Sequence, residues 1–353
     1  MEQAPIRLGI FTARNLKTTS DCSPETILNI LDSLKNNSCI VDILLMDDLV
    51  PESKRVTEDK LLKLPMYIPF SQVFEHPKIN KVRSISDLKL AEIKNDYDMA
   101  IVAIYNDYGE DGKILGMLEL LGVPYLSPSQ KVSSVCFDKY YTKALLAHAG
   151  VTTPRSFFVD PANCNSVYIN SQIPTEINYP VVIKAVSSGN SWGVTIVRKS
   201  EELDKAIEAA LEYSQEILVE AYVEGDEYTV GVVGNYWEAE ALPVVSIKHT
   251  SKFFDYTAKY KVGGSIEICP AEINETVKKL LQSAASEAYR AVKCDSHARI
   301  DIILGKDGLA YVLDINTFPG LNRASLFPKE LVAAGGSLET FLEEQITLKT
   351  VRH

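Results

Sequence analysis

Residues 297–326 read HARIDIILGKDGLAYVLDINTFPGLNRASL, and this stretch decides the fold that we expect for the chain. It contains two apolar segments, 298–304 and 309–315, each with the length of a strand. Between them stands Asp307-Gly308, a dipeptide that is the strongest short signal for a β-hairpin. The stretch therefore predicts two antiparallel strands that turn at Asp307-Gly308.

This hairpin would bring four polar side chains together. Counting outward from the turn sets Asp301 opposite Asp314 and Arg299 opposite Asn316. Because successive side chains of a strand point to opposite faces, we expect these four on one face. The opposite face is filled by the aliphatic residues Ile300, Ile302 and Val312.

The two aspartates predict a metal site. Facing Cβ atoms of paired strands lie about 5 Å apart, so Asp301 and Asp314 repel each other unless a cation lies between them. Oxygen ligands on rigid strands, with the amide of Asn316 nearby, suit Mg²⁺, which accepts one or two carboxylates and leaves room for substrate phosphates. The alternative is a polar face that only points at water. The loop that follows, residues 317–322 (TFPGLN), favours the metal site because ordered loops often carry function.

Composition limits the function classes. A chain of 353 residues exceeds one comfortable core, so two or three domains are expected. A hydrophobic content of 46% and a charged content of 24% are those of a soluble globular protein. The net charge of −11 argues against nucleic acid and against an anionic membrane surface as partners.

Other features predict a cytoplasmic protein. No segment approaches the roughly 20 apolar residues of a membrane span, and the N-terminus lacks the basic and apolar regions of a signal peptide. The six cysteines are scattered without the paired spacing of zinc or redox sites, so reduced thiols are expected. The five histidines have no acid at matching spacing, which speaks against histidine acid–base catalysis.

Strands and helices alternate in the first part of the chain, which predicts a parallel α/β domain. Its expected strands are 6–11, 41–46 and 98–105, and its expected helices 24–35 and 112–122, with irregular chain over 50–90. A single helix is expected at 133–149, followed by strands at 180–186, 194–199 and 216–222 around a helix at 201–213. The last part holds strands at 227–233 and 239–247, a helix at 271–293 and, after the hairpin, helices at 328–334 and 338–344.

Two loops are candidates for ligand contact. Residues 187–193 (SSGNSWG) join two strands, so they are neither a Walker loop nor a dinucleotide fingerprint, but their backbone N–H groups can fold over phosphates. Residues 248–268 hold four lysines and several aromatic residues. This second loop is either a functional lid or a solvated insertion.

Seven motifs in order resemble the D-alanine–D-alanine ligase family of ATP-grasp enzymes. They are YNDYGEDGKILGMLELLGVPY (105–125), FDKYYTK (137–143), YPVVIKAVSSGNSWGV (179–194), ILVEAYVEGDEYTV (217–230), FFDYTAKY (253–260), ARIDI (298–302) and LDINTFPGLNRASLFP (313–328). The resemblance implies an α/β ATP-grasp fold with three α/β domains: an N-terminal domain (1–127), a central domain (128–223), and a C-terminal domain (224–353) with the lid 248–268.

The resemblance also implies a reaction and its ligands. ATP and two Mg²⁺ would bind between the central and C-terminal domains, and the amine of an amino acid would attack an acyl phosphate to give an amide, ADP and phosphate. The positions that match ATP-binding residues are Lys139, Lys184, Ser191, Glu220, Tyr222, Val223, Glu227, Phe253 and Lys259. Those that match the metal ligands are Asp301, Asp314 and Asn316, and the family usually has Glu at the position of Asp314.

By the same resemblance, Arg299 steadies the transferring phosphoryl group and the tetrahedral intermediate. The lid residues Lys259 and Tyr260 belong with it to the catalytic set, and Asn190 stands where the family has the serine that holds the lid tyrosine. Substrate contacts fall on Tyr105, Gly320, Arg323, Ser325 and Leu326.

The departures from the family concern the activated substrate. The family's glutamate that meets the ammonium of the first D-alanine is nearest to Thr19 here, and Asp21 is the only nearby acid. Tyr105 replaces a histidine. An ammonium without a carboxylate loses a charge-assisted bond of about 1.5–3 kcal/mol. The pocket for the activated partner is therefore expected to be rebuilt.

Three functions stay open. The first, which we favour, is an ATP-dependent ligase that phosphorylates a carboxylate or enol-like ketone oxygen of a small acceptor other than D-alanine and joins it to an amino acid. Mycosporine-glycine with serine or threonine is one such pair. The second is a true D-alanine–D-alanine ligase, and the third a non-catalytic nucleotide-binding relative. Small molecules are the expected partners, and a homodimer is expected from the family.

Overall fold

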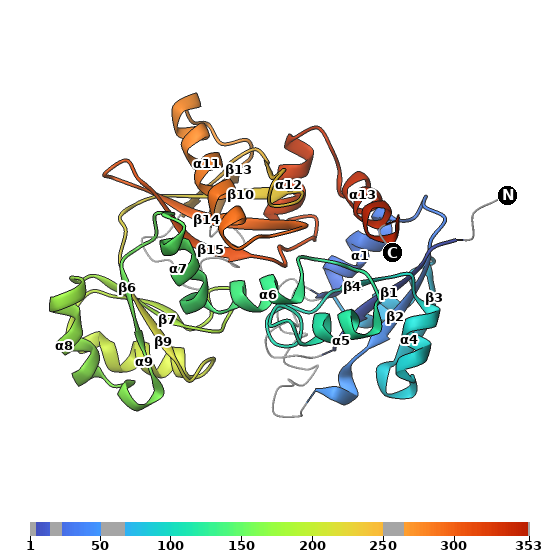
Figure 1. Cartoon of the computed structure of the whole chain (residues 1–353), viewed down its shortest axis with the longest axis horizontal. Coiled ribbons are helices and arrows are strands. Elements are labelled where there is room, and N and C mark those ends of the chain that lie inside the picture. Colours follow the sequence, from blue (N-terminus) through green and yellow to red (C-terminus); the bar gives the residue numbers. More distant parts are fainter. Residues whose placement is uncertain (1–4, 15–22, 51–67, 250–264, 352–353) are drawn as a thin grey trace. The chain divides into compact units, whose positions relative to one another are not determined.

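The structure is a computed structural model, and it describes residues 5–14, 23–50, 68–249 and 265–351 (Figure 1). The described chain mixes helices with parallel and antiparallel sheets, as expected of an α/β protein. It divides into two compact units: residues 1–133 together with 318–353, and residues 134–317. The division into three domains at residues 127 and 223 stays a prediction.

The first unit is built on a five-stranded sheet of order β3-β2-β1-β4-β5 whose neighbouring strands run parallel. Its strands are β1 (Arg7–Thr12), β2 (Ile40–Leu45), β3 (Ile79–Ser84), β4 (Met99–Val102) and β5 (Tyr125–Leu126). Its helices are α1 (Ser23–Ser33), α3 (Phe70–Phe74), α4 (Leu90–Asp96), α5 (Lys113–Leu121), α12 (Leu326–Ala333) and α13 (Leu338–Val351). Short 3-10 turns lie at η1 (Asp47–Leu49) and η3 (Ile85–Asp87).

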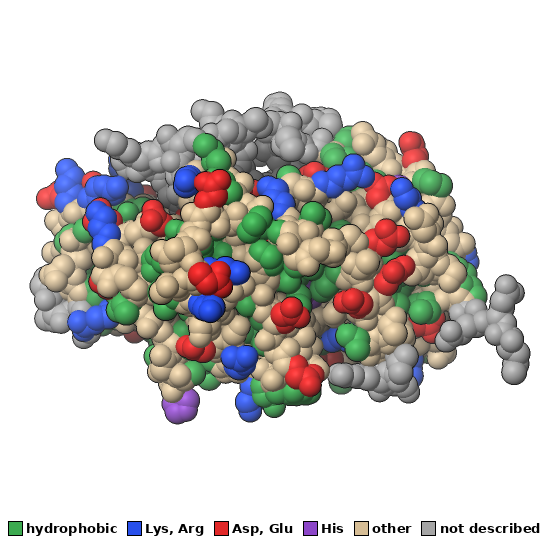
Figure 2. Space-filling view, turned by 90° about the horizontal axis from the view of Figure 1, so that it is seen from above, with side chains coloured by type: hydrophobic (Ala, Val, Ile, Leu, Met, Phe, Trp, Pro, Cys, Tyr) green, Lys and Arg blue, Asp and Glu red, His purple; other side chains and the backbone are tan. Residues whose placement is uncertain are grey.

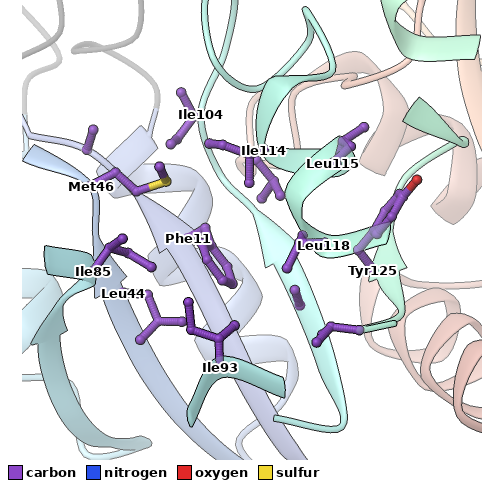
Figure 3. Close-up of a cluster of buried hydrophobic side chains, with 14 of the residues drawn as sticks. Phe11, Leu44, Met46, Ile85, Ile93, Ile104, Ile114, Leu115, Leu118 and Tyr125 are labelled. Carbon is purple, nitrogen blue, oxygen red and sulfur yellow. The ribbon is translucent and has the colours of Figure 1, made fainter. Parts of the chain in front are cut away.

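A buried apolar cluster holds one face of this sheet against α4 and α5 (Figure 3). Phe11 of β1 and Leu44 of β2 are fully buried there, and Leu115 and Leu118 of α5 pack against them. Parallel strands that are buried on both faces read as continuous apolar runs, which is why IRLGIF and VDILLM were recognisable as strands.

The second unit contains two sheets. The four-stranded sheet has the order β6-β9-β7-β8 and is antiparallel. Its elements are β6 (Ser156–Val159), β7 (Val181–Ala185), β8 (Val194–Val197), β9 (Ile217–Ala221), α8 (Ser166–Glu176), α9 (Leu203–Leu211) and the 3-10 turns η4 (Pro161–Asn163) and η5 (Ser200–Glu202). Helices α8 and α9 cover one face, and apolar side chains of both pack on β7 and β9.

The six-stranded sheet has the order β13-β12-β10-β14-β15, with β11 paired to β10. Its strands are β10 (Gly225–Val233), β11 (Glu240–Ala241), β12 (Val245–His249), β13 (Ser265–Ile268), β14 (His297–Gly305) and β15 (Ala310–Asn316). Helix α11 (Glu275–Ala291) packs on β10, β14 and β15 (Figure 1). Helix α6 (Gln130–Phe137) crosses the boundary between the units, and α7 (Lys139–His148) contacts β15.

The hairpin is present, but its turn is one residue longer than predicted. The N–H of Gly308 donates to the carbonyl of Gly305 at 2.9 Å, and the N–H of Gly305 donates to the carbonyl of Leu309 at 2.8 Å. The loop therefore spans residues 306–308, and Gly308 adopts the left-handed φ of 82° that such a loop requires. The prediction of a two-residue turn was wrong by one residue.

A β-bulge restores the predicted register. Next to the turn Ile302 pairs with Val312, whereas a two-residue turn would pair it with Leu313. Leu313 is the additional residue of the bulge, and beyond it the strands return to the predicted register. The predicted facing pairs are confirmed: Arg299 with Asn316, and Asp301 with Asp314.

The bulge also decides which face Val312 occupies. Strict alternation along β15 would place Val312 on the same face as Asp314. The structure instead buries Val312 completely together with Ile300 and Ile302, while Asp301 and Asp314 are only partly buried. The polar and apolar faces of the hairpin thus separate as expected, and the bulge is the reason.

Several predicted elements differ from those observed. The helix expected at 133–149 is two helices, because Asp138 adopts an extended backbone and its carboxylate accepts from the N–H groups of Tyr140 and Tyr141 as the cap of α7. The strand expected at 239–247 is interrupted between β11 and β12, where Pro243 has no N–H to give a sheet. Residues 79–84, expected to be irregular, form β3 at a sheet edge.

Surface composition and hydropathy add two observations. Among the described residues, no helix is both long enough and apolar enough to span a bilayer. On the face shown in Figure 2, acidic and basic side chains of the described residues are interspersed, without a broad field of one sign.

Core packing behind the hairpin yields a test. Replacing fully buried Ile302 by Ala should lower the free energy of unfolding by about 2–5 kcal/mol, because it leaves a cavity under the polar face. Leu309→Ala is the matched control on the same hairpin, since Leu309 is 49% exposed and its truncation should change stability by about 0.5 kcal/mol or less. Urea titration of both variants measures this, and equal losses would contradict the assignment of faces.

Candidate active site

The carboxylate of Asp301 is held by donors from three strands. Arg299 donates from Nε to Oδ1 at 2.9 Å and from Nη2 to Oδ2 at 3.0 Å, which makes a two-point ion pair along β14. The amide of Asn316 donates to Oδ2 at 3.0 Å from β15, and the hydroxyl of Thr229 donates to Oδ1 at 2.8 Å from β10. The side chains of Arg299 and Asp301 are only 17% and 15% exposed. The predicted polar face is thus a partly buried, hydrogen-bonded network.

Asp314 stands across from this network on β15 and differs from Asp301. In the part of the chain that the structure describes, no side chain donates a hydrogen bond to its carboxylate. Asn316 uses its Nδ2 toward Asp301, so its amide oxygen points elsewhere. Two carboxylates and one amide oxygen are ligands that suit Mg²⁺, with substrate phosphates or water completing the shell.

These residues fit a nucleotide-borne magnesium ion better than a closed protein cage. Among the described residues, no group of three or more His, Cys, Asp or Glu side chains could hold a metal by itself. The donor set fits Mg²⁺ that arrives with phosphates, and such an ion would compete with the hydrogen bonds that Asp301 accepts from Arg299, Asn316 and Thr229.

A second charged cluster lies on the four-stranded sheet. Lys184 of β7 and Glu220 of β9 are diagonal neighbours on antiparallel strands, and Lys184 Nζ lies 2.8 Å from Glu220 Oε2. Lys143 of α7 approaches the other oxygen as an ion pair, with its Nζ 2.9 Å from Glu220 Oε1 but without hydrogen-bond geometry. All three side chains are almost fully buried, at 8% exposure or less. One carboxylate is thus shared by two ammonium groups.

The contacts within this cluster and its burial shift the pKa values of all three side chains. Burial pushes the pKa of Glu220 up, but the positive charges of Lys143 and Lys184 outweigh it and lower the pKa below the ordinary value. Burial likewise disfavours the charged form of Lys184, yet the carboxylates of Glu220, Asp314 and Asp301 together raise its pKa. For Lys143 burial dominates, and with the nearby charge of Lys184 it lowers the pKa.

Lys184 connects the two sheets electrostatically. Its charge interacts with Asp314 and Asp301 of the hairpin, although Lys184 itself stands on the four-stranded sheet. A lysine near two strand-borne carboxylates, all partly or fully buried, is an arrangement that can receive a magnesium-bound polyphosphate.

The glycine-rich loop, residues 187–193, contacts α7 through Lys139. Lys139 is the first residue of α7, is buried, and donates from Nζ to the carbonyl of Ser188. The loop is a tight turn in which the predicted residues Asn190 and Ser191 have φ values of 53° and 60°. Gly193 also has a positive φ, and a Cβ there would lie 2.9 Å from that of Ala185. This position therefore requires glycine on both counts.

Three further residues predicted to bind ATP lie between β9 and β10 or on β10: Tyr222, Val223 and Glu227. Tyr222 is 38% exposed and lines a hollow of about 550 Å³ with Pro180, Arg198 and Glu224. Val223 follows it in the same connection, and Glu227 is on β10 opposite Ile303 and Ile247. The predicted lid residues Phe253, Lys259 and Tyr260 lie outside the described residues, as do Thr19 and Asp21.

The predicted substrate residues all belong to the first unit. Tyr105 is buried, and its hydroxyl lies 2.9 Å from that of Thr26 on α1. Gly320 lies so close to the hydroxyl of Ser325 that a Cβ would clash with it, and Leu326 begins α12.

Arg323 extends from the same loop onto α1. Its Nη2 donates to Asp32 at 2.6 Å, and its side chain is 74% exposed. The amide of Asn29 donates to the carbonyl of Leu321 at 2.6 Å, so two side chains of α1 fix the loop. The role of these residues in substrate binding stays a prediction.

Two residues of the clusters were missed at the level of sequence. Thr229 carries no sequence signal, because its importance arises from its pairing with Asp301 across β10 and β14. Lys143 does carry one: it stands four residues after Lys139 in FDKYYTK, and such residues share a helix face.

Comparison with known proteins agrees with this geometry. The family model described as "D-ala D-ala ligase C-terminus" matches residues 145–347, more than half of the chain. The chain belongs to the D-alanine–D-alanine ligase family. It is therefore an ATP-grasp protein and an ATP-dependent carbon–nitrogen ligase by class.

Individual relatives span most of the chain. A D-alanine–D-alanine ligase A from Bacillus cereus is 38% identical over 259 residues, which cover 72% of this chain and 82% of the relative. The structure of the VanG D-Ala:D-Ser ligase from Enterococcus faecalis is similar with a TM-score of 0.79 and 25% identity, covering 98% of this chain and 99% of that one. A D-alanine–D-alanine ligase from Bacillus anthracis complexed with ATP gives a TM-score of 0.71 at 26% identity, covering 99% and 98%.

The shared carboxylate yields a stability test. Glu220→Gln removes the only charge placed between Lys143 and Lys184 in the buried cluster, so the free energy of unfolding at neutral pH should fall by about 3–5 kcal/mol. Glu212→Gln is the matched control, because Glu212 is exposed at the end of α9 and should change stability by about 0.5 kcal/mol or less. Equal stabilities in urea titration would contradict the buried cluster.

The pH dependence of stability is a separate test with a defined sign. The pKa of Glu220 in the folded chain lies below its ordinary value of 4.5. Its contribution is therefore complete above that pH and is lost as the pH falls through the lower, folded value. The stability gap between wild type and Glu220→Gln should narrow in the acid range below pH 4.5. A gap that stays constant there would show that the carboxylate does not carry the effect.

Proposed function

We propose that the protein phosphorylates an oxygen of a small acceptor with ATP and then joins that acceptor to the amine of an amino acid. The observation that carries the proposal is the polar face of the hairpin, where Asp301 faces Asp314 and Arg299 faces Asn316 across β14 and β15. Buried Lys184, paired with Glu220, supports it, since the hairpin carboxylates help to raise its pKa. Membership of the family supports it, and so does the similarity to a ligase structure complexed with ATP.

In this proposal, the lysines and a magnesium ion held by the hairpin neutralise different parts of the ATP phosphate chain. Lys139 and Lys184 neutralise phosphate oxygens as compact point charges. Asp301, Asp314 and Asn316 hold Mg²⁺. When bound, that ion neutralises the phosphates and favours displacement at the γ-phosphorus. Ser191, Tyr222, Val223 and Glu227 are assigned to the nucleotide by the family match, with the lid residues.

Arg299 has two states in this scheme. It pairs with Asp301 at both oxygens in the present structure. Turned from Asp301, its guanidinium can meet the negative charge that develops on the transferring phosphoryl group and on the tetrahedral intermediate. Its two-point pair therefore acts as a resting position.

The bonds balance in two steps. An acceptor oxygen attacks the γ-phosphorus, and the bond from that phosphorus to the bridging oxygen of ADP breaks. The amine of the amino acid then attacks the activated carbon, a C–N bond forms, the C–O bond breaks and phosphate leaves with its electron pair. The proton of the amine passes to solvent.

The proposed acceptor lacks a free ammonium, because the chain has Thr19 nearest to the family's ammonium-binding glutamate. Mycosporine-glycine, condensed with serine or threonine to an imine, is the pair that we propose. A second candidate is D-alanine–D-alanine ligation, which the names of the relatives favour.

ADP release separates these two candidates. With purified full-length chain, MgATP and D-alanine alone, the proposal expects background ADP release, and with mycosporine-glycine plus serine or threonine it expects turnover that requires both compounds. Robust ADP release with D-alanine alone would reject the first candidate in favour of the second. Product masses identify the bond formed.

Substitution of Arg299 tests its role in catalysis. Arg299→Met should lower kcat by about 10²–10³-fold, because a preorganised charge at the developing anion is lost. Arg290→Met is the control, since Arg290 is exposed on α11 in the same unit and should leave kcat unchanged. An Arg299→Met enzyme with wild-type kcat and the same product would remove Arg299 from the mechanism.

A further inference from the structure

Lys143 is a buried lysine to which the family match gives no role. It stands on α7 with its Nζ 2.9 Å from Glu220 Oε1, while Lys184 Nζ lies 2.8 Å from Glu220 Oε2. Its side chain is 8% exposed. We propose that Lys143 is a positioning residue that holds one oxygen of Glu220, so that Lys184 keeps positive charge available for the nucleotide phosphates. The inference rests on the proposed function and concerns the same site.

Lys143 changes the balance of charge around Glu220. Two ammonium groups share the single carboxylate of Glu220, and all three side chains are at most 8% exposed, so water screens their charges little. Without Lys143, Glu220 and Lys184 form a neutral pair, and the carboxylate can turn both oxygens toward Lys184. Phosphates would then meet a lysine whose charge is already compensated.

Burying the charge of Lys143 costs free energy. Burial is the main influence on its pKa and disfavours the ammonium form. A buried charged triad is often no more stable than apolar side chains of the same volume. The burial of three charges is therefore weak evidence of a gain in stability, and the charge of Lys143 points to binding.

The start of α7 fixes where Lys143 points. Asp138 accepts from the N–H groups of Tyr140 and Tyr141, which sets the first turn of the helix. Lys139 and Lys143 then lie four residues apart on one buried face, while both tyrosines lie at the exposed surface. The helix thus presents two lysines inward, one to the loop carbonyl of Ser188 and one to Glu220.

Binding of ADP and of adenosine to the full chain tests the inference. In calorimetric titrations with excess Mg²⁺, Lys143→Met and Lys143→Gln should raise the dissociation constant for ADP about 10–100-fold, the size of a charge-assisted interaction. Adenosine has no phosphates, so its dissociation constant should rise by a clearly smaller factor than that for ADP. Lys143→Arg should recover most of the ADP affinity.

Controls keep a folding defect apart from a binding effect. Lys205→Met removes an exposed lysine of α9 in the same unit and should leave ADP binding unchanged. A purely structural role predicts that Lys143→Met weakens ADP and adenosine equally and lowers the thermal midpoint. The glutamine variant, which keeps a donor, provides a second reading if the methionine variant does not fold.

The outcomes are distinct. ADP binding by wild type with unchanged affinity in a folded Lys143→Met or Lys143→Gln chain overturns the inference alone. Equal loss of ADP and adenosine affinity overturns it as well. Absence of ADP binding by the wild-type chain overturns the proposed function and, with it, this inference.

Discussion

The carboxylate of Glu220 lies between two buried ammonium groups, and the charged cluster of the second unit depends on this contact. It allows Lys143 and Lys184 to stay charged in a region with little water, where an isolated ammonium would lose its proton or destabilise the fold. Because Lys184 also interacts with Asp301 and Asp314, the same contact links the charge of the four-stranded sheet to that of the hairpin. In the proposed function, the atoms that stabilise this part of the fold are also those that bind phosphate.

The hairpin solves a complementary problem. Two aspartates face each other across β14 and β15, and Arg299 compensates one of them through two hydrogen bonds. Asp301 is satisfied without a ligand, whereas the carboxylate of Asp314 receives no hydrogen bond from a side chain of the described residues. This is how a polar face can be stable on its own and still be ready for a charged substrate.

The residues that match the family and those that depart from it concern different substrates of the proposed reaction. The lysines, the glutamate and the hairpin residues match positions that the family uses for ATP and metal, and they belong to the second unit. The differences that bear on the acceptor, at Thr19 and Tyr105, lie in the first unit. In the proposed function, nucleotide chemistry and acceptor choice thus depend on different parts of the chain, so the relatives' names alone do not specify the acceptor.

The facing pairs Arg299–Asn316 and Asp301–Asp314 were predicted correctly only because the bulge at Leu313 offsets the additional residue of the turn. The sequence by itself determined the alternation of strands and helices and the presence of the hairpin. These depend on side-chain period and local turn chemistry, which are readable within a few residues. It missed the break at Asp138, the three-residue turn and the bulge at Leu313, because a cap and a bulge are chosen by hydrogen bonds to the surrounding backbone. Only the tertiary structure could place Lys143 on Glu220 and Thr229 on Asp301. Those contacts join elements far apart in the chain, and sequence spacing holds no information on which buried charges will share a partner.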